Sequence, residues 1–186
     1  MRLICCAMAL LIALTADASA AARAQITPAQ VIPAEVTRAQ VTRAQVTRAY
    51  VMNGLFVGTG LATIAARLRE RGYIVAYGSY TQDRQFAADA CANPGDRIIV
   101  IGHSFGAERA AKVATQAAAC GARDVTMIGI DPAAPAEVSG VAHAVNFVGE
   151  YRGTIAGADN IPMPGYTHMG IMESPEVQAR ILEQAQ

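Results

Sequence analysis

From residue 50 onward, short apolar runs alternate with segments that carry a helical stripe. The strand-like runs are residues 51–56, 73–77, 97–101, 125–130 and 144–148. The run at 97–101, RIIVI, is apolar on both faces, as expected of a central strand in a parallel sheet. Helix-like segments lie at 61–71, 82–91 and 107–119, and a last helix begins at Pro175 after the N-cap Ser174. This order predicts an α/β fold, with a mostly parallel sheet and helices on both of its faces.

Residues 1–24 have the pattern of a secretory signal peptide. Arg2 gives a positive start, residues 3–14 form an apolar run of twelve, and Ala18-Ser19-Ala20 offers a cleavage site. A membrane-spanning helix needs roughly 20 apolar residues, so this run favours cleavage over an uncleaved anchor. We therefore expect an exported protein, periplasmic or secreted, with no membrane span after cleavage.

Residues 25–49 repeat a five-residue unit and end with EVTRA, QVTRA and QVTRA. A period of five matches neither a helix nor a strand, so no face of either element stays apolar along the repeat. We expect a disordered linker over 25–49 and a folded domain over 50–186.

Composition narrows the classes of function. Of the 186 residues, 53% are hydrophobic and 16% are charged, and the formal net charge is zero, which gives no basic face for nucleic acid. The chain contains no Trp, so Ala, Val, Ile and Leu must fill most of the core. No cluster of His, Cys or Asp has metal-ligand spacing, and the glycines at 54, 58 and 60 lack the rest of a dinucleotide motif. We expect neither a metal nor a cofactor.

Two cysteines remain after residue 24, Cys91 and Cys120. Each lies at the end of a predicted helix, one before and one after the strand at 97–101. Both ends fall at the same edge of the predicted sheet, so a disulfide between them is plausible in an oxidising compartment. Two buried free thiols are the alternative.

The motif with the clearest chemistry is Gly102-His103-Ser104-Phe105-Gly106. It follows a buried strand and opens into a helix, which is the context that a G-x-S-x-G nucleophile turn requires. The two glycines remove Cβ atoms that would clash in such a tight turn. Ser104 would then project at the helix N-terminus, where the backbone N–H of Phe105 can stabilise a developing oxyanion.

Together with three further segments, this motif resembles the α/β-hydrolase superfamily in a shortened lipase/esterase-like form. The segments are Asn53-Gly54-Leu55-Phe56 after the first strand, Asp131-Pro132 after the fourth, and His168 before the last helix. The resemblance covers most of residues 51–186. It implies a serine hydrolase with its reactive residues in the order Ser, Asp, His. It also implies a second oxyanion N–H from Leu55, with Phe56 as the neighbouring option.

A nucleophilic serine needs a base, and the chain has three histidines. His103 lies inside the turn, and we expect its side chain to point away from the position of a base. His143 precedes a strand and is expected to be exposed or to act indirectly. His168 lies in a loop before the last helix, where the superfamily carries its histidine, and it is our candidate base.

Three carboxylates are candidates for the acid that orients His168. Asp131 follows a buried strand, and its loop resembles the acid loop of the pancreatic-type lipases. Glu150 follows the next strand, which is the commoner position across the superfamily. Asp159 stands beside Asn160 in a predicted turn and is the third choice.

The expected activity is cleavage of carboxylic esters through an acyl-enzyme on Ser104. The stretch between residues 130 and 144 is too short for a helical lid, so we expect a minimal hydrolase fold with an open site. Such a site suits small-molecule, lipid or polymer esters. A thioesterase or amidase with the same residues is an alternative, as is a non-catalytic hydrolase-like binding module tethered in the cell envelope.

Overall fold

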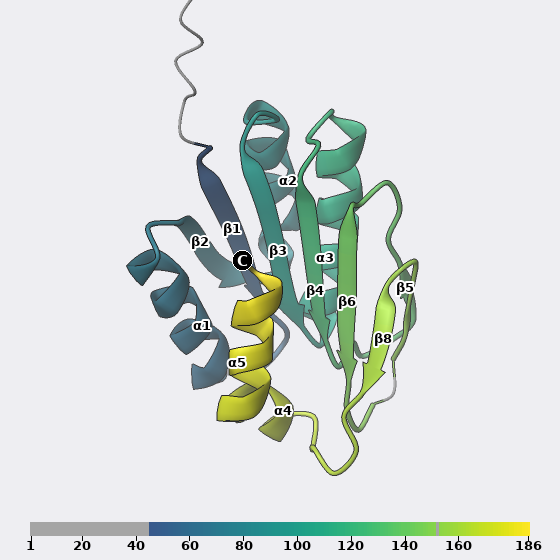
Figure 1. The fold of residues 1–186 in the computed structure, drawn as a ribbon. Coiled ribbons are helices and arrows are strands. Elements are labelled where there is room, and N and C mark those ends of the chain that lie inside the picture. The colour runs from purple at the N-terminus through teal and green to yellow at the C-terminus, as the bar shows by residue number, and fades with distance from the viewer. Residues whose placement is uncertain (1–44, 152) are drawn as a thin grey trace, which may run out of the picture. The chain divides into compact units, whose positions relative to one another are not determined.

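The computed structural model describes residues 45–151 and 153–186, which form a parallel sheet covered by helices (Figure 1). The main sheet has six strands in the order β2-β1-β3-β4-β6-β8, and all neighbouring strands are parallel. These strands are β1 (Thr47–Asn53), β2 (Ile74–Ser79), β3 (Arg97–His103), β4 (Val125–Ile130), β6 (His143–Val148) and β8 (Asp159–Pro162). A second, two-stranded parallel sheet pairs β5 (Ala136–Glu137) with β7 (Ile155–Ala156).

The helices lie on both faces of the main sheet, which confirms the predicted fold class. They are α1 (Thr59–Glu70), the 3-10 helix η1 (Tyr80–Gln82), α2 (Asp83–Ala92), α3 (Phe105–Ala119), α4 (Gly170–Glu173) and α5 (Pro175–Gln184). On one face α1 and α5 cover the sheet, and on the other face α2 and α3 cover it. The predicted N-cap is present, because the Ser174 hydroxyl accepts a hydrogen bond from the Val177 N–H.

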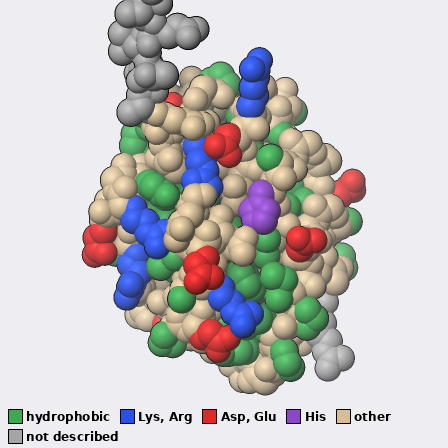
Figure 2. Space-filling model, viewed as in Figure 1, with side chains coloured by type: hydrophobic (Ala, Val, Ile, Leu, Met, Phe, Trp, Pro, Cys, Tyr) green, Lys and Arg blue, Asp and Glu red, His purple; other side chains and the backbone are tan. Residues whose placement is uncertain are grey.

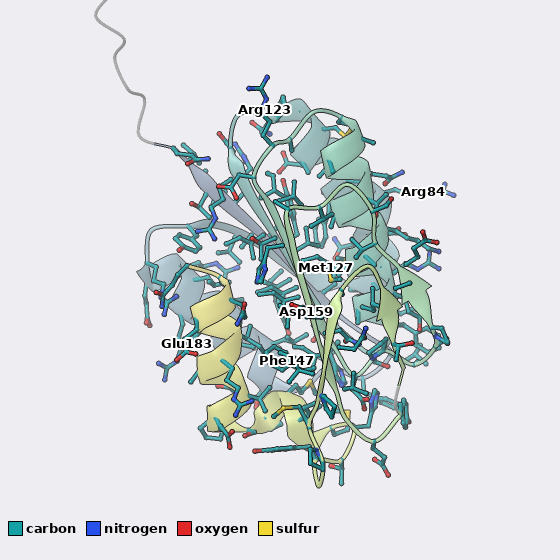
Figure 3. All side chains as sticks on the ribbon, turned by 45° about the vertical axis from the view of Figure 1, so that its right-hand side comes forward. Arg84, Arg123, Met127, Phe147, Asp159 and Glu183 are labelled. Carbon is teal, nitrogen blue, oxygen red and sulfur yellow. A yellow bond between two sulfur atoms is a disulfide. The ribbon has the colours of Figure 1, made fainter. Side chains whose placement is uncertain are left out.

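Alternate residues of the strands supply two cores. In β3, Ile99 and Ile101 face the α1–α5 layer, whereas Ile98 and Val100 face the α2–α3 layer. Figure 3 labels one residue of each core, with Phe147 on the α1–α5 face and Met127 on the α2–α3 face. Buried alanines line the inner side of α3, and their small side chains let this helix pack closely on the sheet.

The boundary expected between linker and domain needs correction. β1 begins at Thr47, so the last three residues of the five-residue repeat belong to the sheet, where Arg48 pairs with Ile74 of β2. The Arg48 guanidinium is held by Asp96 at 2.6 Å, which lets a basic residue occupy an interior strand. β1 also ends at Asn53, so the apolar residues that follow are a loop rather than strand. The predicted signal peptide and residues 25–44 of the repeat lie outside the described residues.

Three short strands were not predicted, namely β5, β7 and β8. β8 is polar and contains a proline, and it pairs only with β6 at the edge of the sheet. Between β4 and β6 the chain forms only the two-residue β5 and no helix.

A disulfide joins Cys91, near the C-terminal end of α2, to Cys120, which directly follows α3. The two Cα atoms are 5.3 Å apart. Both helices end at the edge of the sheet where β3 and β4 begin. The disulfide therefore ties the α2–α3 layer together at the edge opposite Ser104.

The described ranges contain no helix that is long and apolar enough to cross a membrane. Basic and acidic side chains are interspersed on the face drawn in Figure 2, without a patch of one sign.

Candidate active site

Ser104 lies at a strained turn between β3 and α3. Its backbone angles are φ 57° and ψ −129°, a region that residues with a Cβ rarely adopt. The turn is held by a hydrogen bond from the Ser104 N–H to the Ile130 carbonyl oxygen at 3.0 Å. A Cβ at Gly102 would lie 2.0 Å from the carbonyl oxygen of Gly106, and one at Gly106 would lie 2.3 Å from that of Met52. Both glycines of the motif are therefore required sterically.

The loop after β1 lies directly beside this serine. A Cβ placed on Gly54 would come within 2.7 Å of the Ser104 Cβ and 3.2 Å of its Oγ. This close approach brings the next residue, Leu55, to the same corner of the sheet as Phe105. Within residues 45–151 and 153–186, neither the Leu55 N–H nor the Phe105 N–H bonds a protein acceptor, so both donors are free for a ligand.

Asp131 and His168 are hydrogen-bonded to each other at the same edge. His168 Nδ1 lies 2.8 Å from Asp131 Oδ2. Asp131 is fully buried, and its carboxylate also accepts the backbone N–H groups of Gly149 at 2.9 Å and Tyr151 at 3.2 Å. Because a buried carboxylate is costly unless it is hydrogen-bonded, these three donors explain how it is accommodated. Asp131 can thus fix both the orientation and the tautomer of the His168 ring, with the proton on Nδ1.

Neither of the other two candidate acids is hydrogen-bonded to the His168 ring. Glu150 Oε2 accepts the backbone N–H of His168 at 2.9 Å, so it holds the loop rather than the imidazole. Asp159 is exposed in β8 at the edge of the sheet (Figure 3). Of the three candidates, only Asp131 has the contact that an orienting acid requires.

Two aromatic rings enclose the His168 imidazole. Tyr151 stacks on it, with ring centroids 3.7 Å apart and an angle of 12° between the planes. On another side lies His103, whose ring centroid is 4.5 Å from that of His168. The expectation that His103 points away from the position of the candidate base was wrong, because its ring packs against that of His168.

His103 is buried and donates from Nε2 to the backbone carbonyl oxygen of His168 at 2.8 Å. A carbonyl can only accept, so the proton of neutral His103 resides on Nε2. Burial lowers the pKa of His103 to about 4. His103 is therefore neutral near pH 7, and it supports the backbone of the His168 loop. His143 is exposed, as expected, and its Nε2 lies 2.6 Å from Gln184 Oε1.

Ser104 and His168 are both 7% exposed. Within the described ranges no hydrogen bond joins the Ser104 hydroxyl to His168. Such bonds are often long before a substrate binds and tighten in the reacting complex. Ser104 directly follows His103, whose ring contacts both the ring and the backbone of His168.

A hollow of about 730 Å³ opens beside the His168 loop, at the carboxyl ends of β6 and β8. Its lining includes Val148, Glu150, Pro162, Met163, Tyr166 and Thr167. The hollow offers space for part of a ligand next to the site.

In the described part of the chain, no group of three or more His, Cys, Asp or Glu side chains could hold a metal ion.

Sequence reasoning missed two contacts of the site. The stacking of Tyr151 on His168 had no signal in the sequence beyond its position after Glu150. The contact of His103 with His168 could have been suspected, since a histidine inside a buried turn must find a hydrogen-bond acceptor.

No protein family model matches the chain, and no curated protein matches it significantly.

Proposed function

We propose that the protein is a serine hydrolase of the α/β-hydrolase type that cleaves carboxylic esters. The observation that carries this proposal is the buried hydrogen bond between His168 Nδ1 and Asp131, at the same sheet edge as the strained Ser104. A histidine oriented by a carboxylate beside a serine at a helix N-terminus is the arrangement that activates a hydroxyl nucleophile.

In the proposed reaction, Ser104 Oγ attacks the acyl carbon of the ester while His168 Nε2 takes the hydroxyl proton. The N–H groups of Leu55 and Phe105 stabilise the negative charge that forms on the carbonyl oxygen. The C–O bond to the alcohol then breaks, and His168 returns the proton to the departing alkoxide. Water, deprotonated by His168, releases the acid from the acyl-enzyme, and Ser104 recovers its proton. Asp131 keeps the His168 ring oriented and stabilises its positive charge throughout.

An open site suits ester substrates that need not be enclosed, such as short-chain or exposed polymeric esters. The stretch between β4 and β6 holds only the two-residue β5, and the hollow beside His168 opens to solvent. We further propose that the chain is exported, on the basis of the pattern in residues 1–24. Amino-terminal sequencing of the protein recovered outside the cytoplasm tests this export and locates the cleavage site.

A fluorophosphonate probe tests the reaction. This reagent labels only an activated serine, so Ser104 should be modified and the Ser104→Ala variant should not. Hydrolysis of p-nitrophenyl butyrate should be lost in parallel. A folded protein that resists the probe and leaves this ester intact would contradict the proposal and would favour the binding module.

A further inference from the structure

The exposed large hydrophobic side chains of the described residues are concentrated around the site. There are seven such residues, and all but Ile74 belong to segments that carry the site. The six are Leu55, Phe56, Val57, Phe105, Tyr151 and Met169, which we call the apolar rim. Elsewhere the large apolar side chains are mostly buried in the two cores. The rim is therefore a local exception to the way this chain buries apolar surface.

The rim comes from four segments that the fold brings to one edge of the sheet. Leu55, Phe56 and Val57 follow Gly54, which is in contact with Ser104. Phe105 follows Ser104 directly. On the other side, Tyr151 stacks on His168 and Met169 follows it in the chain. On the face drawn in Figure 2, hydrophobic side chains gather at the lower end, toward which the strands of Figure 1 run.

The exposure within the rim is large enough to need an explanation. Phe56 is 69% exposed and Val57 is 77% exposed, and the two are adjacent in the chain. Leaving such side chains in water forgoes the favourable free energy of burying their apolar surface. Clustered exposure of this kind commonly marks a surface that meets an apolar partner.

Charge indicates what kind of partner fits. Residues 53–58, 103–106 and 163–173 contain no Lys or Arg, but Glu173 lies among them and Glu150 lies beside His168. Arg152, next to Tyr151, lies outside the described residues. Surfaces that bind anionic lipids do so mainly through clusters of Lys and Arg. Among the described residues, the rim segments contain no such cluster, so an apolar phase without net charge suits the rim better than an acidic membrane.

We propose that the apolar rim docks the protein on a lipid surface without net charge, so that Ser104 faces esters presented there. The docking itself follows from the rim, and the choice of esters rests on the proposed function. Since Leu55 is both a rim residue and a proposed oxyanion donor, the surface that docks and the site that reacts are continuous. No lid has to open, so docking requires no rearrangement of the stretch between β4 and β6.

Single tryptophans test the docking, because the chain contains none. Phe56→Trp places the reporter in the rim, and Ile74→Trp places it at an exposed apolar position outside the rim. Both are made in the full chain with Ser104→Ala, so that no lipid is hydrolysed. Both variants contain residues 1–24, so membrane binding by that segment is common to both. A difference between the two reporters therefore reports on the rim.

With phosphatidylcholine vesicles, the emission of the Phe56→Trp variant should shift to shorter wavelength and be quenched by brominated phosphatidylcholine. The emission of the Ile74→Trp variant should not change. The proposal is overturned if the Phe56→Trp emission does not move, if both reporters move alike, or if the change requires phosphatidylglycerol. A shift that follows protein concentration without vesicles would instead show a second copy on the rim. Because the Ser104→Ala background cannot react, a failure here is separate from a failure of fluorophosphonate labelling.

Discussion

Tyr151 lies flat on the His168 ring, 3.7 Å away between centroids, and also donates its backbone N–H to Asp131. One residue thus contacts both members of the buried pair. Tyr151 is 54% exposed, so it lies between the imidazole and solvent. We expect the Tyr151 ring to hold the His168 imidazole in position by stacking, and the stack does not need the Tyr151 hydroxyl.

Replacing Tyr151 by Ala should therefore lower kcat/KM moderately, while Tyr151→Phe should retain it. An aromatic stack contributes about 0.5–1.5 kcal/mol, which corresponds to a loss of roughly two- to twelvefold. Steady-state hydrolysis of p-nitrophenyl butyrate measures both variants. An equal loss in the Phe and Ala variants would show that the hydroxyl matters and would contradict a role limited to stacking.

The contacts of Asp131 and Glu150 predict very different effects of removing each negative charge. Asp131→Asn should lower kcat by roughly 10⁴-fold, as in other enzymes where the orienting acid is changed to its amide and the histidine tautomer is lost. Glu150→Gln should change kcat little, because the amide oxygen can still accept the His168 N–H. Thermal unfolding of both variants checks that they are folded. A larger loss in Glu150→Gln than in Asp131→Asn would identify Glu150 as the acid.

The contact of Gly54 with Ser104 predicts that this position tolerates no side chain. A Cβ there would meet the Ser104 Cβ at 2.7 Å, so Gly54→Ala must move the serine or the loop. Small displacements of a reacting group are costly, and we expect the rate of fluorophosphonate labelling to fall about tenfold or more. Gly95→Ala is the matched control, since its Cβ would meet nothing within 4 Å. Similar labelling rates for the two variants would contradict the close approach.

His103 makes stability depend on pH in a definite direction. Burial lowers its pKa from 6.5 to about 4, so between these values the unfolded chain binds more protons than the folded one. The contribution of neutral His103 is complete above about pH 6.5 and is lost as the pH falls toward 4. At pH 4.5 this costs roughly 2–3 kcal/mol of unfolding free energy relative to pH 7.

Urea unfolding at the two pH values measures this loss. His103→Gln should remove that part of the difference, because glutamine can donate to the His168 carbonyl oxygen without titrating. His143→Gln is the matched control, since it makes the same replacement at an exposed histidine. If His103→Gln shows the same pH dependence as the parent protein, His103 does not titrate as described.

Local patterns were sufficient to predict much of this fold. The extents of β4 and α3 follow from uninterrupted apolar runs and helical stripes, and the turn at Ser104 follows from the steric demand of two glycines. β8 could not be predicted, because a four-residue polar strand with a proline owes its existence to the open edge of β6. The start of β1 was predicted too late because Thr47 and Arg48 continue the five-residue repeat. The residues that hold Arg48 in the sheet are more than 40 positions away in the sequence.

The residue types of the candidate site and their order along the chain could be predicted from the sequence. The contacts that depend on how side chains pack could not. Ser104, Asp131 and His168 were chosen from their places relative to the predicted strands and helices and from the resemblance to the α/β-hydrolase superfamily. The choice between Asp131 and Glu150 depends on which carboxylate faces the ring and which faces the backbone of His168. That difference arises from the positive φ of Asp131 and the path of the Gly149–Tyr151 turn, neither of which is encoded in a local pattern.

The strand order also has a consequence during synthesis, when the amino-terminal part of the chain is made first. β1 lies between β2 and β3, so both of its edges are paired only after both of these later strands have been made. The site needs residues from Gly54 to His168, and α5 must still pack on the sheet behind them. A nascent or truncated chain that lacks residue 168 therefore holds Ser104 without the proposed base, so the proposed reactivity of the serine requires the segment that carries His168.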